Sequence, residues 1–511
     1  MGSFKGLGVR QAYVQKWSRF GWELGGGRIP RANGVHVEVS NMCKQVSSPA
    51  RPWSFVFAHD EITPGNILRP DNKRKFTSFY FSFAEFGNFA IRHEVVWFHL
   101  AVLRSSIAHK VVGGLSCAVR LLLKALLGEE HGFQRGVLLP LDDGPTLLFA
   151  KLQTHLGDEA ALAQGLSLKG ASGIRPCIKC ANVLKKASEL AGHRPNELVE
   201  ITCTDVARFM ACDDRDIWRS YDRLAAVGAH ATRAEIERQE RAAGLNINAN
   251  GVIADLSLRP LVGPVSSLTF DWQHTYLSNG VASQEVHMFL KSCRQAGIAD
   301  IWSLLQQYCG AEWSFPSQNK QKALSIVEVF NKTREKACHD HFKSGASELL
   351  TVYPLVRRFA ESILLSQFPV LQQNVLSFTL CCKVLDMLQD AKGGVAQSDV
   401  LAAAICNHLQ QHKRVYGEDD WKPKLHYSLH IPQQVLRDNM LFDCFVVERS
   451  HQVPKLLAAD VKKTETFEKT VIARSLLVRV GDLKEFDERP CLKGKVIPFP
   501  EFGLHSAWPT C

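Results

Sequence analysis

Residues Trp53–Asn66 read WSFVFAHDEITPGN, a short β-prone run that ends in acidic residues and then in a turn. Aromatic and β-branched residues favour strands, and the Thr-Pro-Gly-Asn sequence favours a turn. Trp53–Ala58 is therefore predicted to be a strand, with Asp60 and Glu61 at its end. Strand ends that lie side by side in one sheet can bring acids from distant parts of a sequence together. We therefore expect the sheet and the functional site to meet at this stretch.

The sequence predicts three neighbouring strands, a helix, a fourth strand and a second helix. The helices carry apolar residues at spacings of three and four, whereas the strands are short aromatic or aliphatic runs. Acids follow the first and fourth strands, Asp158 coming directly after the fourth. This is the element order of a ribonuclease-H-like mixed sheet. The predicted elements are, in order, Trp53–Ala58, Phe76–Phe83, Glu94–Val102, the helix Ala108–Leu127, Pro145–Leu156 and the helix Glu159–Leu166.

Three acids are candidates for a divalent-metal site. Asp60 and Asp158 each follow an apolar run at a turn or a glycine, and Glu448 follows the apolar Phe445–Val447. Phosphodiester hydrolysis and strand transfer use two Mg²⁺ ions about 3.5–4 Å apart, held by carboxylates, water and substrate phosphate. Glu61 competes with Asp60 for the role of the first metal-binding acid. For each acid the alternative is solvation of the protein surface.

Two paired half-sites predict a structural zinc ion. Cys177 and Cys180 form a Cys-x-x-Cys, in which a tight turn can bring both thiolates to one tetrahedral ion. His426 and His430 are four residues apart, so their rings share one face of a helix. The four together form a Cys2His2 set that would join distant parts of the chain. Other partners stay open, namely Cys203 with Cys212, or His274, and so does a set of packing residues without metal.

Two further motifs accompany the acids. Glu448, His451 and Lys455 would line one face of a continuous helix, with Arg449 beside them, although Pro454 disfavours such a helix. Arg449 and Lys455 are candidates for phosphate contacts, and a solvated charged face is the alternative. The second motif is Phe270–His274 (FDWQH), in which Asp271 and His274 could contact DNA or orient the ligands of the site. Its alternative is a capped helix start with a packed tryptophan.

A helical block separates the second acid from the third. From Ala181 to about Lys422 the apolar periodicity is helical, which indicates an insertion into one core. The expected fold is α/β, a ribonuclease-H-like mixed sheet core interrupted by a large all-α insertion domain and stapled by a Cys2His2 zinc site. The expected segments are a loosely ordered N-terminal segment (1–50), the first part of the core (51–180), the helical insertion (181–422), the second part of the core (423–486) and an irregular tail (487–511). The expected insertion helices are Asp214–Ala226, Ala231–Ala243, Gln284–Ala296, Lys320–Lys336, Tyr353–Leu365 and Ser398–His412.

Composition narrows the class of protein. The 511 residues include 61 Lys and Arg against 51 Asp and Glu, a formal charge of +10, which permits a polyanionic partner without identifying one. The fifteen cysteines form no disulfide framework, and no run of about 18 apolar residues occurs. We therefore expect an intracellular protein without a membrane span, in which paired cysteines hold metal.

These motifs resemble those of cut-and-paste transposases of the DDE/D type, of the CACTA and Kyakuja-Dileera-Zisupton kind. The spacing of acids, cysteines and histidines is also similar to that of Transib transposases and of the catalytic subunit of the V(D)J recombinase. The resemblance covers roughly Trp53 to Lys455. It rests on the stretches His59–Lys75, Gly157–Cys180 (GDEAALAQGLSLKGASGIRPCIKC), Phe270–Val281 (FDWQHTYLSNGV) and Lys422–His451.

The resemblance implies a function. Asp60, Asp158 and Glu448 match the three catalytic acids, which bind Mg²⁺ or Mn²⁺, and His451 matches a histidine after the glutamate. Such enzymes cut double-stranded DNA at transposon terminal repeats and join the freed 3′ end to target DNA. They act as homo-oligomers in the nucleus. The basic stretch Arg69–Lys75 (RPDNKRK) is either a nuclear address or a solvated turn.

The chain also departs from these families. Little more than the N-terminal segment precedes the first strand, where related transposases carry a separate DNA-binding or oligomerisation module. A truncated copy, a decayed element and a domesticated gene all remain open. The expectation is thus a magnesium-dependent transposase or nuclease, with a catalytically silent, transposase-derived DNA- or protein-binding scaffold as the alternative.

Overall fold

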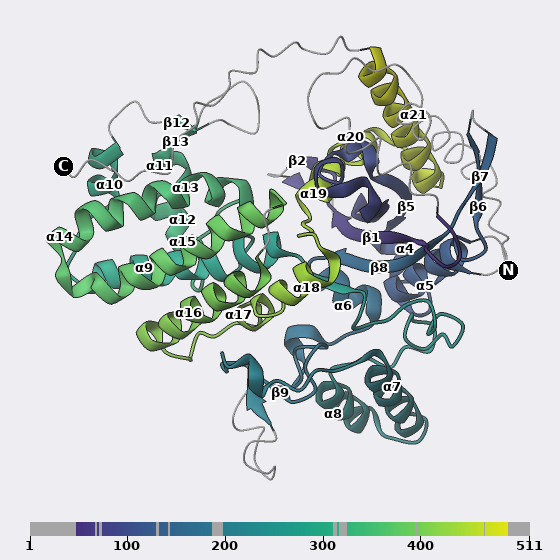
Figure 1. Ribbon diagram of the computed structural model, residues 1–511, viewed down its shortest axis with the longest axis horizontal. Coiled ribbons are helices and arrows are strands. Elements are labelled where there is room, and N and C mark those ends of the chain that lie inside the picture. Colours follow the sequence, from purple (N-terminus) through teal and green to yellow (C-terminus); the bar gives the residue numbers. More distant parts are fainter. Residues whose placement is uncertain are drawn as a thin grey trace.

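The protein is an α/β structure with a five-stranded mixed sheet in one lobe and a mostly helical second lobe (Figure 1). In Figure 1 the sheet lobe lies on the right in purple and blue, and the helical lobe lies on the left in teal and green. The computed structural model describes residues 47–66, 69–70, 74–128, 132–141, 144–185, 198–309, 314–315, 324–394, 397–463 and 465–488.

The central sheet has the strand order β5-β4-β1-β8-β11. β4 runs antiparallel to both β1 and β5, whereas β1, β8 and β11 run parallel to one another. The predicted strand Phe76–Phe83 coincides with β4, and the strand predicted at Trp53–Ala58 continues four residues further, to Ile62. The strands are β1 (Trp53–Ile62), β4 (Phe76–Phe83), β5 (Phe98–Arg104), β8 (Ala150–Gly157) and β11 (Leu268–Phe270).

Both faces of the sheet are covered, which is why all eight residues of β4 are buried. Side chains alternate between faces along a strand, so odd-numbered residues such as Phe55, Phe57 and Phe81 share one face. They pack with α5 (Gly114–Leu127), and the rings of Phe55 and Phe81 stack at 5.3 Å. The other face of β1, β4 and β5 packs against α20 (Gln452–Asp460) and α21 (Phe467–Glu488). Asp60 belongs to this second face.

The helical lobe has its own hydrophobic core, built mainly by α9 (Val281–Gln295), α13 (Ala346–Phe359), α15 (Gln372–Lys392) and α16 (Ser398–Tyr416). The sequence did not predict α15, because its apolar residues leave no clear polar stripe. Strand β11 lies inside the range 181–422 expected to be helical, yet it extends the sheet of the other lobe. The expected segment boundaries remain predictions.

Several predicted elements shift at their ends. The run expected at Glu94–Val102 begins as a 3₁₀ turn, and the helix expected at Ala108–Leu127 begins only at Gly114, as α5, after the short helix α4 (Ser105–Ala108). The helix expected at Lys320–Lys336 falls partly outside the described residues, as do most of segment 1–50 and nearly all of the tail. The described part of Lys320–Lys336 holds the strand β13 (Leu324–Ser325) and two short helices, α11 (Ile326–Val329) and α12 (Lys332–Lys336).

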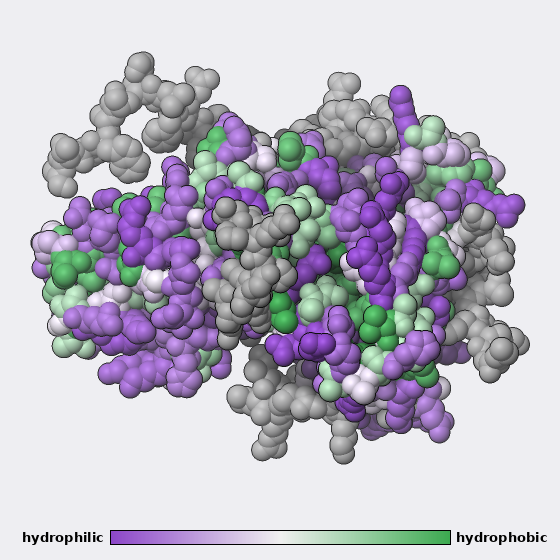
Figure 2. Space-filling view, turned by 90° about the horizontal axis from the view of Figure 1, so that it is seen from below, coloured by the Kyte–Doolittle hydropathy of each residue, from purple (hydrophilic) through white to green (hydrophobic). Residues whose placement is uncertain are grey.

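Among the remaining elements, the helix Glu159–Leu166 packs on the sheet, and the helix Asp214–Gly228 belongs to a smaller hydrophobic core of its own. No helix in the described ranges is long and apolar enough to cross a membrane. The face seen in Figure 2 carries mainly hydrophilic side chains, with hydrophobic ones in small groups. The remaining elements are β2 (Gly65–Asn66), β3 (Arg69–Pro70), α3 (Gly87–Ala90), α4 (Ser105–Ala108), β6 (Val137–Leu141), β7 (Gly144–Leu148), α6 (Glu159–Leu166), β9 (Val183–Leu184), β10 (Val199–Glu200), α7 (Asp214–Gly228), α8 (Arg233–Ala243), α10 (Ile301–Cys309), β12 (Ser314–Phe315), β13 (Leu324–Ser325), α11 (Ile326–Val329), α12 (Lys332–Lys336), α14 (Leu365–Gln367), α17 (Pro423–Ser428), α18 (Ile431–Asp438) and α19 (Phe445–Ser450).

Candidate metal centre and carboxylate site

The four residues of the predicted Cys2His2 set meet in the buried interior and form a group that can hold a metal ion. Cys177 Sγ lies 3.3 Å from His430 Nε2, and Cys180 Sγ lies 3.5 Å from His426 Nε2. The two imidazole Nε2 atoms are 3.3 Å apart. The histidines do not share one helix, because His426 is in α17 and His430 caps the start of α18. Their rings meet across the bend between the two helices.

These separations match the chemistry of zinc. With bonds of about 2.3 Å to sulfur and about 2.0–2.1 Å to nitrogen, tetrahedral ligands lie about 3.6 Å (S to N) and about 3.4 Å (N to N) apart. Burial alone would raise the pKa of the Cys177 thiol, but its hydrogen bond with Cys180 and the imidazoles of His430 and His426 hold it well below its usual range. A thiolate, the form that binds metal, is therefore favoured at this position.

The Cys2His2 group joins the sheet lobe to the helices that precede the third acid. Tyr427, next to His426, places its hydroxyl 2.8 Å from the Pro176 carbonyl and 3.2 Å from the Glu159 carboxylate. Its ring stacks on Phe270 at 4.3 Å. Glu159 is the first residue of α6, directly after Asp158. The group thus holds α17 against both the start of α6 and the end of β11.

Other candidate zinc ligands lie outside this group. Cys212 is buried near Arg175, Cys203 is partly exposed near the carbonyl of Asp205, and His274 belongs to a different cluster with Asp271.

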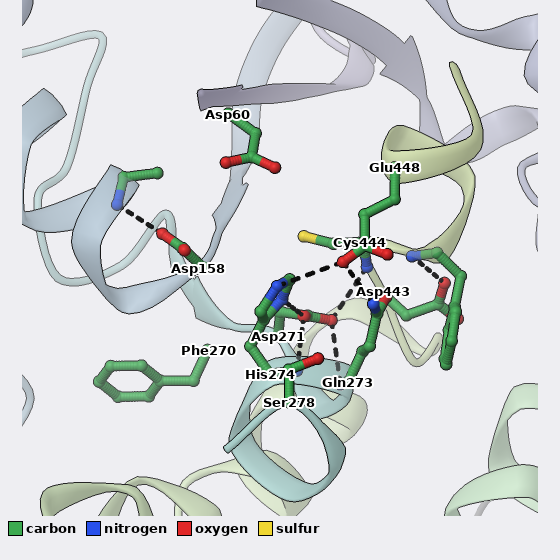
Figure 3. A network of polar contacts seen from close by, with 12 residues as sticks. Asp60, Asp158, Phe270, Asp271, Gln273, His274, Ser278, Asp443, Cys444 and Glu448 are labelled. Carbon is green, nitrogen blue, oxygen red and sulfur yellow. Dashed lines mark hydrogen bonds and ion pairs between the residues drawn. The ribbon is translucent and has the colours of Figure 1, made fainter. Parts of the chain in front are cut away.

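Three acids lie at the same edge of the sheet. Asp60 is near the end of β1, Asp158 follows β8, and Asp271 follows β11. Because these three neighbouring strands are parallel, their carboxyl ends share one edge. Glu448 is supplied by α19, which packs against β1. Figure 3 shows Asp60, Asp158 and Glu448 around a common space, with Asp158 turned to the Ala161 N–H and Glu448 turned to His274, and with Asp271 below.

The Asp60 carboxylate is influenced electrostatically by the other two predicted catalytic acids. Burial and the Asp158 carboxylate raise the pKa of Asp60 to about 7, and Glu448 adds to the rise, whereas His274 and the backbone N–H of Glu61 oppose it. Asp158 caps α6 by accepting a hydrogen bond from the Ala161 N–H at 2.6 Å. A space bordered by several carboxylates resists holding all of their charges unless a cation neutralises them.

A chain of hydrogen bonds holds Glu448 in place (Figure 3). His274 Nδ1 donates to Asp271 Oδ2 at 2.5 Å, and His274 Nε2 lies 3.3 Å from Glu448 Oε1, which also accepts from Gln273 Nε2. Burial alone would lower the pKa of His274, but Asp271 and Glu448 raise it to about 10, so the ring is a cation at neutral pH. Asp271 also caps the following π-helical turn, Gln273–Leu277, beside the buried Trp272.

The alternative given for the Phe270–His274 motif is confirmed in part, since Asp271 caps a π-helical turn and Trp272 is buried. His274 also contacts Glu448, whereas support of a catalytic site by this motif stays a prediction. Gln273, which the sequence did not single out, binds Glu448 directly. Nothing in the pattern FDWQH marked that glutamine, because its partner is 175 residues away.

Glu61, the competitor of Asp60, faces away from the site. It accepts a hydrogen bond from Ser105 Oγ at 2.6 Å and forms an ion pair with Lys75. Adjacent residues of a strand point to opposite faces, so only one of this pair can face Asp158. Lys75 and Arg74 of the basic stretch have protein partners, Arg74 donating to the Ala459 carbonyl. Part of that stretch lies outside the described residues.

The helix expected through Glu448 and Lys455 is divided in two, with His451 at the junction of α19 and α20. Burial, aided by His274 and Lys455, lowers the pKa of His451 to about 3, so the ring is neutral. Its Nδ1 lies 3.7 Å from Asp60 Oδ2, too far for a hydrogen bond. Arg449 pairs with Glu94, and a contact between Arg449 or Lys455 and phosphate remains a prediction.

A lysine that the sequence did not mark also lies close to the acids. Lys424 in α17 donates to the Ser278 carbonyl at 2.8 Å. Burial lowers its pKa, while the neighbouring Glu159, Asp158 and Asp271 carboxylates oppose that shift. A cation in this position can face a bound polyanion.

No family model matches the chain, and no curated protein matches it. The chemistry of the site therefore has to be inferred from its geometry.

Replacing Asp60 by asparagine is expected to stabilise the protein at pH 8 in buffer without divalent cations. A carboxyl whose folded pKa (about 7) exceeds its unfolded value (3.8) keeps its proton longer when folded, so stability falls as the pH rises through this window. Asp60→Asn removes that loss, which we expect to be about 1–3 kcal/mol. The measurement is the thermal unfolding midpoint of both proteins from pH 5 to pH 8. A difference that does not grow with pH would contradict the assignment.

Proposed function

We propose that this protein is a transposase-type DNA strand-cleavage and strand-transfer enzyme with a ribonuclease-H-like core. The observation that carries the proposal is that Asp60, Asp158 and Glu448 lie around one space at the edge of the sheet, near enough for Asp158 and Glu448 to raise the pKa of Asp60. The strand order β5-β4-β1-β8-β11, with β4 antiparallel to both of its neighbours and with β1, β8 and β11 parallel, supports such a core. The motifs quoted from the sequence support the same reading.

The donor set fits magnesium. Mg²⁺ prefers a few carboxylates together with water and substrate phosphate. Asp60, Asp158 and Glu448 would hold it, and bound ions would activate a water or a 3′-hydroxyl and stabilise the leaving oxygen. Among the described residues these three acids do not form a group in which one oxygen from each lies within 4.8 Å of the others, as the ligands of one ion would. Two ions about 3.5–4 Å apart have no such requirement.

The protein's own residues then have separate tasks. Asp271 and His274, with Gln273, fix the direction of the Glu448 carboxylate. The Cys2His2 group, which we propose holds zinc, ties α17 to the start of α6. It thereby fixes the position of Asp158 relative to the helical lobe. The partner is double-stranded DNA in the nucleus, and the two ends of an element would require a homo-oligomer.

A specific observation also favours the alternative, a catalytically silent scaffold. Glu448 Oε1 is already bound by Gln273 and by the His274 cation. An acid occupied by protein donors binds a metal less readily. The scaffold reading predicts DNA or protein binding that does not depend on Mg²⁺.

Incubating the purified chain with supercoiled plasmid in Mg²⁺ or Mn²⁺ tests the proposal. We expect nicked circles whose new ends are 3′-hydroxyls, detected by extension with a DNA polymerase, and no nicking in Ca²⁺. Tight DNA binding without nicking in either metal would establish the scaffold. Absence of both binding and nicking would refute a DNA function altogether.

A further inference from the structure

A second group of metal-binding residue types lies in the helical lobe, away from the carboxylate site. Glu285 is in the middle of α9, and His408 and His412 are four residues apart on α16. The exposed fractions of these three residues are 0%, 0% and 3%. Their ligand atoms all lie within 4.8 Å of one another. None of them takes part in the proposed cleavage chemistry.

The spacing suits a zinc-class ion. His residues at i and i+4 present both rings on one helix face, and a carboxylate from a neighbouring helix completes a His2Glu set. His408 Nε2 lies 3.2 Å from Glu285 Oε2. Two ligands of a tetrahedral ion with bonds of about 2.0 Å are separated by about 3.3 Å. The closer contact, His412 Nδ1 to Glu285 Oε2 at 2.5 Å, is a hydrogen bond that an ion would replace.

Hydrogen bonds within the group leave buried polar atoms unsatisfied. Both rings converge on the same oxygen, Glu285 Oε2. Among the described residues, Glu285 Oε1 and His408 Nδ1 have no hydrogen-bond partner, although both are buried. Buried carboxylate oxygens nearly always have a donor or a metal, because an unpaired one loses its hydration without compensation. A cation between the three side chains would supply the missing partner of the carboxylate.

The surroundings explain what an ion would do there. The lobe's hydrophobic core encloses the group, with Phe289 and Leu409 from the same two helices fully buried. Burial and the Glu285 carboxylate raise the pKa of the nearby Tyr416 phenol well above its usual range, so Tyr416 is a neutral neighbour. The fourth position of a tetrahedral ion would be taken by the second Glu285 oxygen or by a water, and the burial of all three residues closes the site to substrate, which favours a structural ion.

We propose that Glu285, His408 and His412 form a second divalent-metal site, of the zinc class, that fastens α16 to α9. This inference is independent of the proposed function and of the Cys2His2 group. Together with the Cys2His2 group it predicts two zinc ions per chain, each removed by a different set of substitutions.

The test is the zinc content of the purified full-length chain, measured by inductively coupled plasma mass spectrometry after gel filtration. Wild type should hold two zinc ions, whereas Glu285→Gln and His412→Gln should each hold one. His287→Gln is the matched control, since His287 lies on the same helix as Glu285 but outside the group; it should keep two. Gel filtration and circular dichroism show whether each variant is folded.

A spectroscopic readout covers the case in which the variants unfold in part. In protein produced with cobalt in place of zinc, Glu285→Gln should remove the visible bands of a nitrogen- and oxygen-ligated ion. The thiolate-to-cobalt charge-transfer band of Cys177 and Cys180 should persist. The second site would be overturned if Cys177→Ser held no zinc and His412→Gln held as much zinc as wild type. Zinc lost only in His412→Gln would support it and refute the Cys2His2 assignment.

Discussion

Replacing His430 by alanine is expected to remove one zinc ion per chain and to lower the free energy of unfolding by more than about 4 kcal/mol. The reason is geometric, because His430 contacts both Cys177 and Cys180, and an ion left with three ligands has no replacement donor in this buried site. Two thiols would then be buried without their metal. The measurements are zinc content and the thermal unfolding midpoint.

Limited proteolysis adds a local readout to this experiment. The Cys2His2 group holds α17 against α6 and β11, so its loss should expose cleavage sites around α17 before the rest of the chain unfolds. Cys212→Ser is the matched control, since Cys212 is buried close by but contacts neither histidine. Zinc retained in both His430→Ala and Cys177→Ser would refute the ligand set.

Local sequence predicted the parts of the fold that depend on local chemistry. The aromatic runs at β1 and β4 exclude a helix by their alternation and ring content, and α6 begins where Asp158 can cap it. The Cys-x-x-Cys and the histidine pair were also recognisable, since each half has ligand spacing of its own. The mixed sheet and the Cys2His2 group were therefore predictable from residues alone.

Features fixed by distant contacts were not predictable. Strand β11 has only three residues, too few for a recognisable strand pattern. Its parallel pairing with β8 is what makes it a strand. Gln273 and Glu285 are polar residues whose partners lie on other elements, more than 100 positions away. Pro454 already indicated that a continuous helix was disfavoured, but the place of the break at His451, whose ring packs against Tyr80, was not evident. None of these follows from periodicity.

The network around Glu448 also separates two kinds of residue. Asp60, Asp158 and Glu448 face the shared space, whereas Gln273 and His274 act through the glutamate. Removing a residue that orients a metal ligand costs about 10–100-fold in activity. Removing a ligand itself costs several kcal/mol of transition-state stabilisation, which is about 10³-fold or more.

Replacing Glu448 by glutamine should therefore lower DNA nicking at least about 10³-fold, with Asp158→Asn equally severe. His274→Gln should lower it only about 10–100-fold, because Gln273 still holds the glutamate. The neutral replacements keep the shape of each side chain. The dissociation constant for DNA should stay within about threefold of wild type, since each replacement changes one charge at a site that faces the metal rather than the phosphates. The measurement is the initial nicking rate in saturating Mg²⁺ or Mn²⁺.

Glu61→Gln is the control for this series, because Glu61 is next to Asp60 on the same strand but pairs with Lys75 and Ser105 on the opposite face. It should nick DNA within about twofold of wild type, as surface substitutions away from a site usually do. Nicking within tenfold of wild type in Glu448→Gln and Asp158→Asn would exclude these acids as metal ligands. Equal losses in Glu61→Gln and Glu448→Gln would instead indicate a general effect on folding, which the thermal midpoints of the same preparations would reveal.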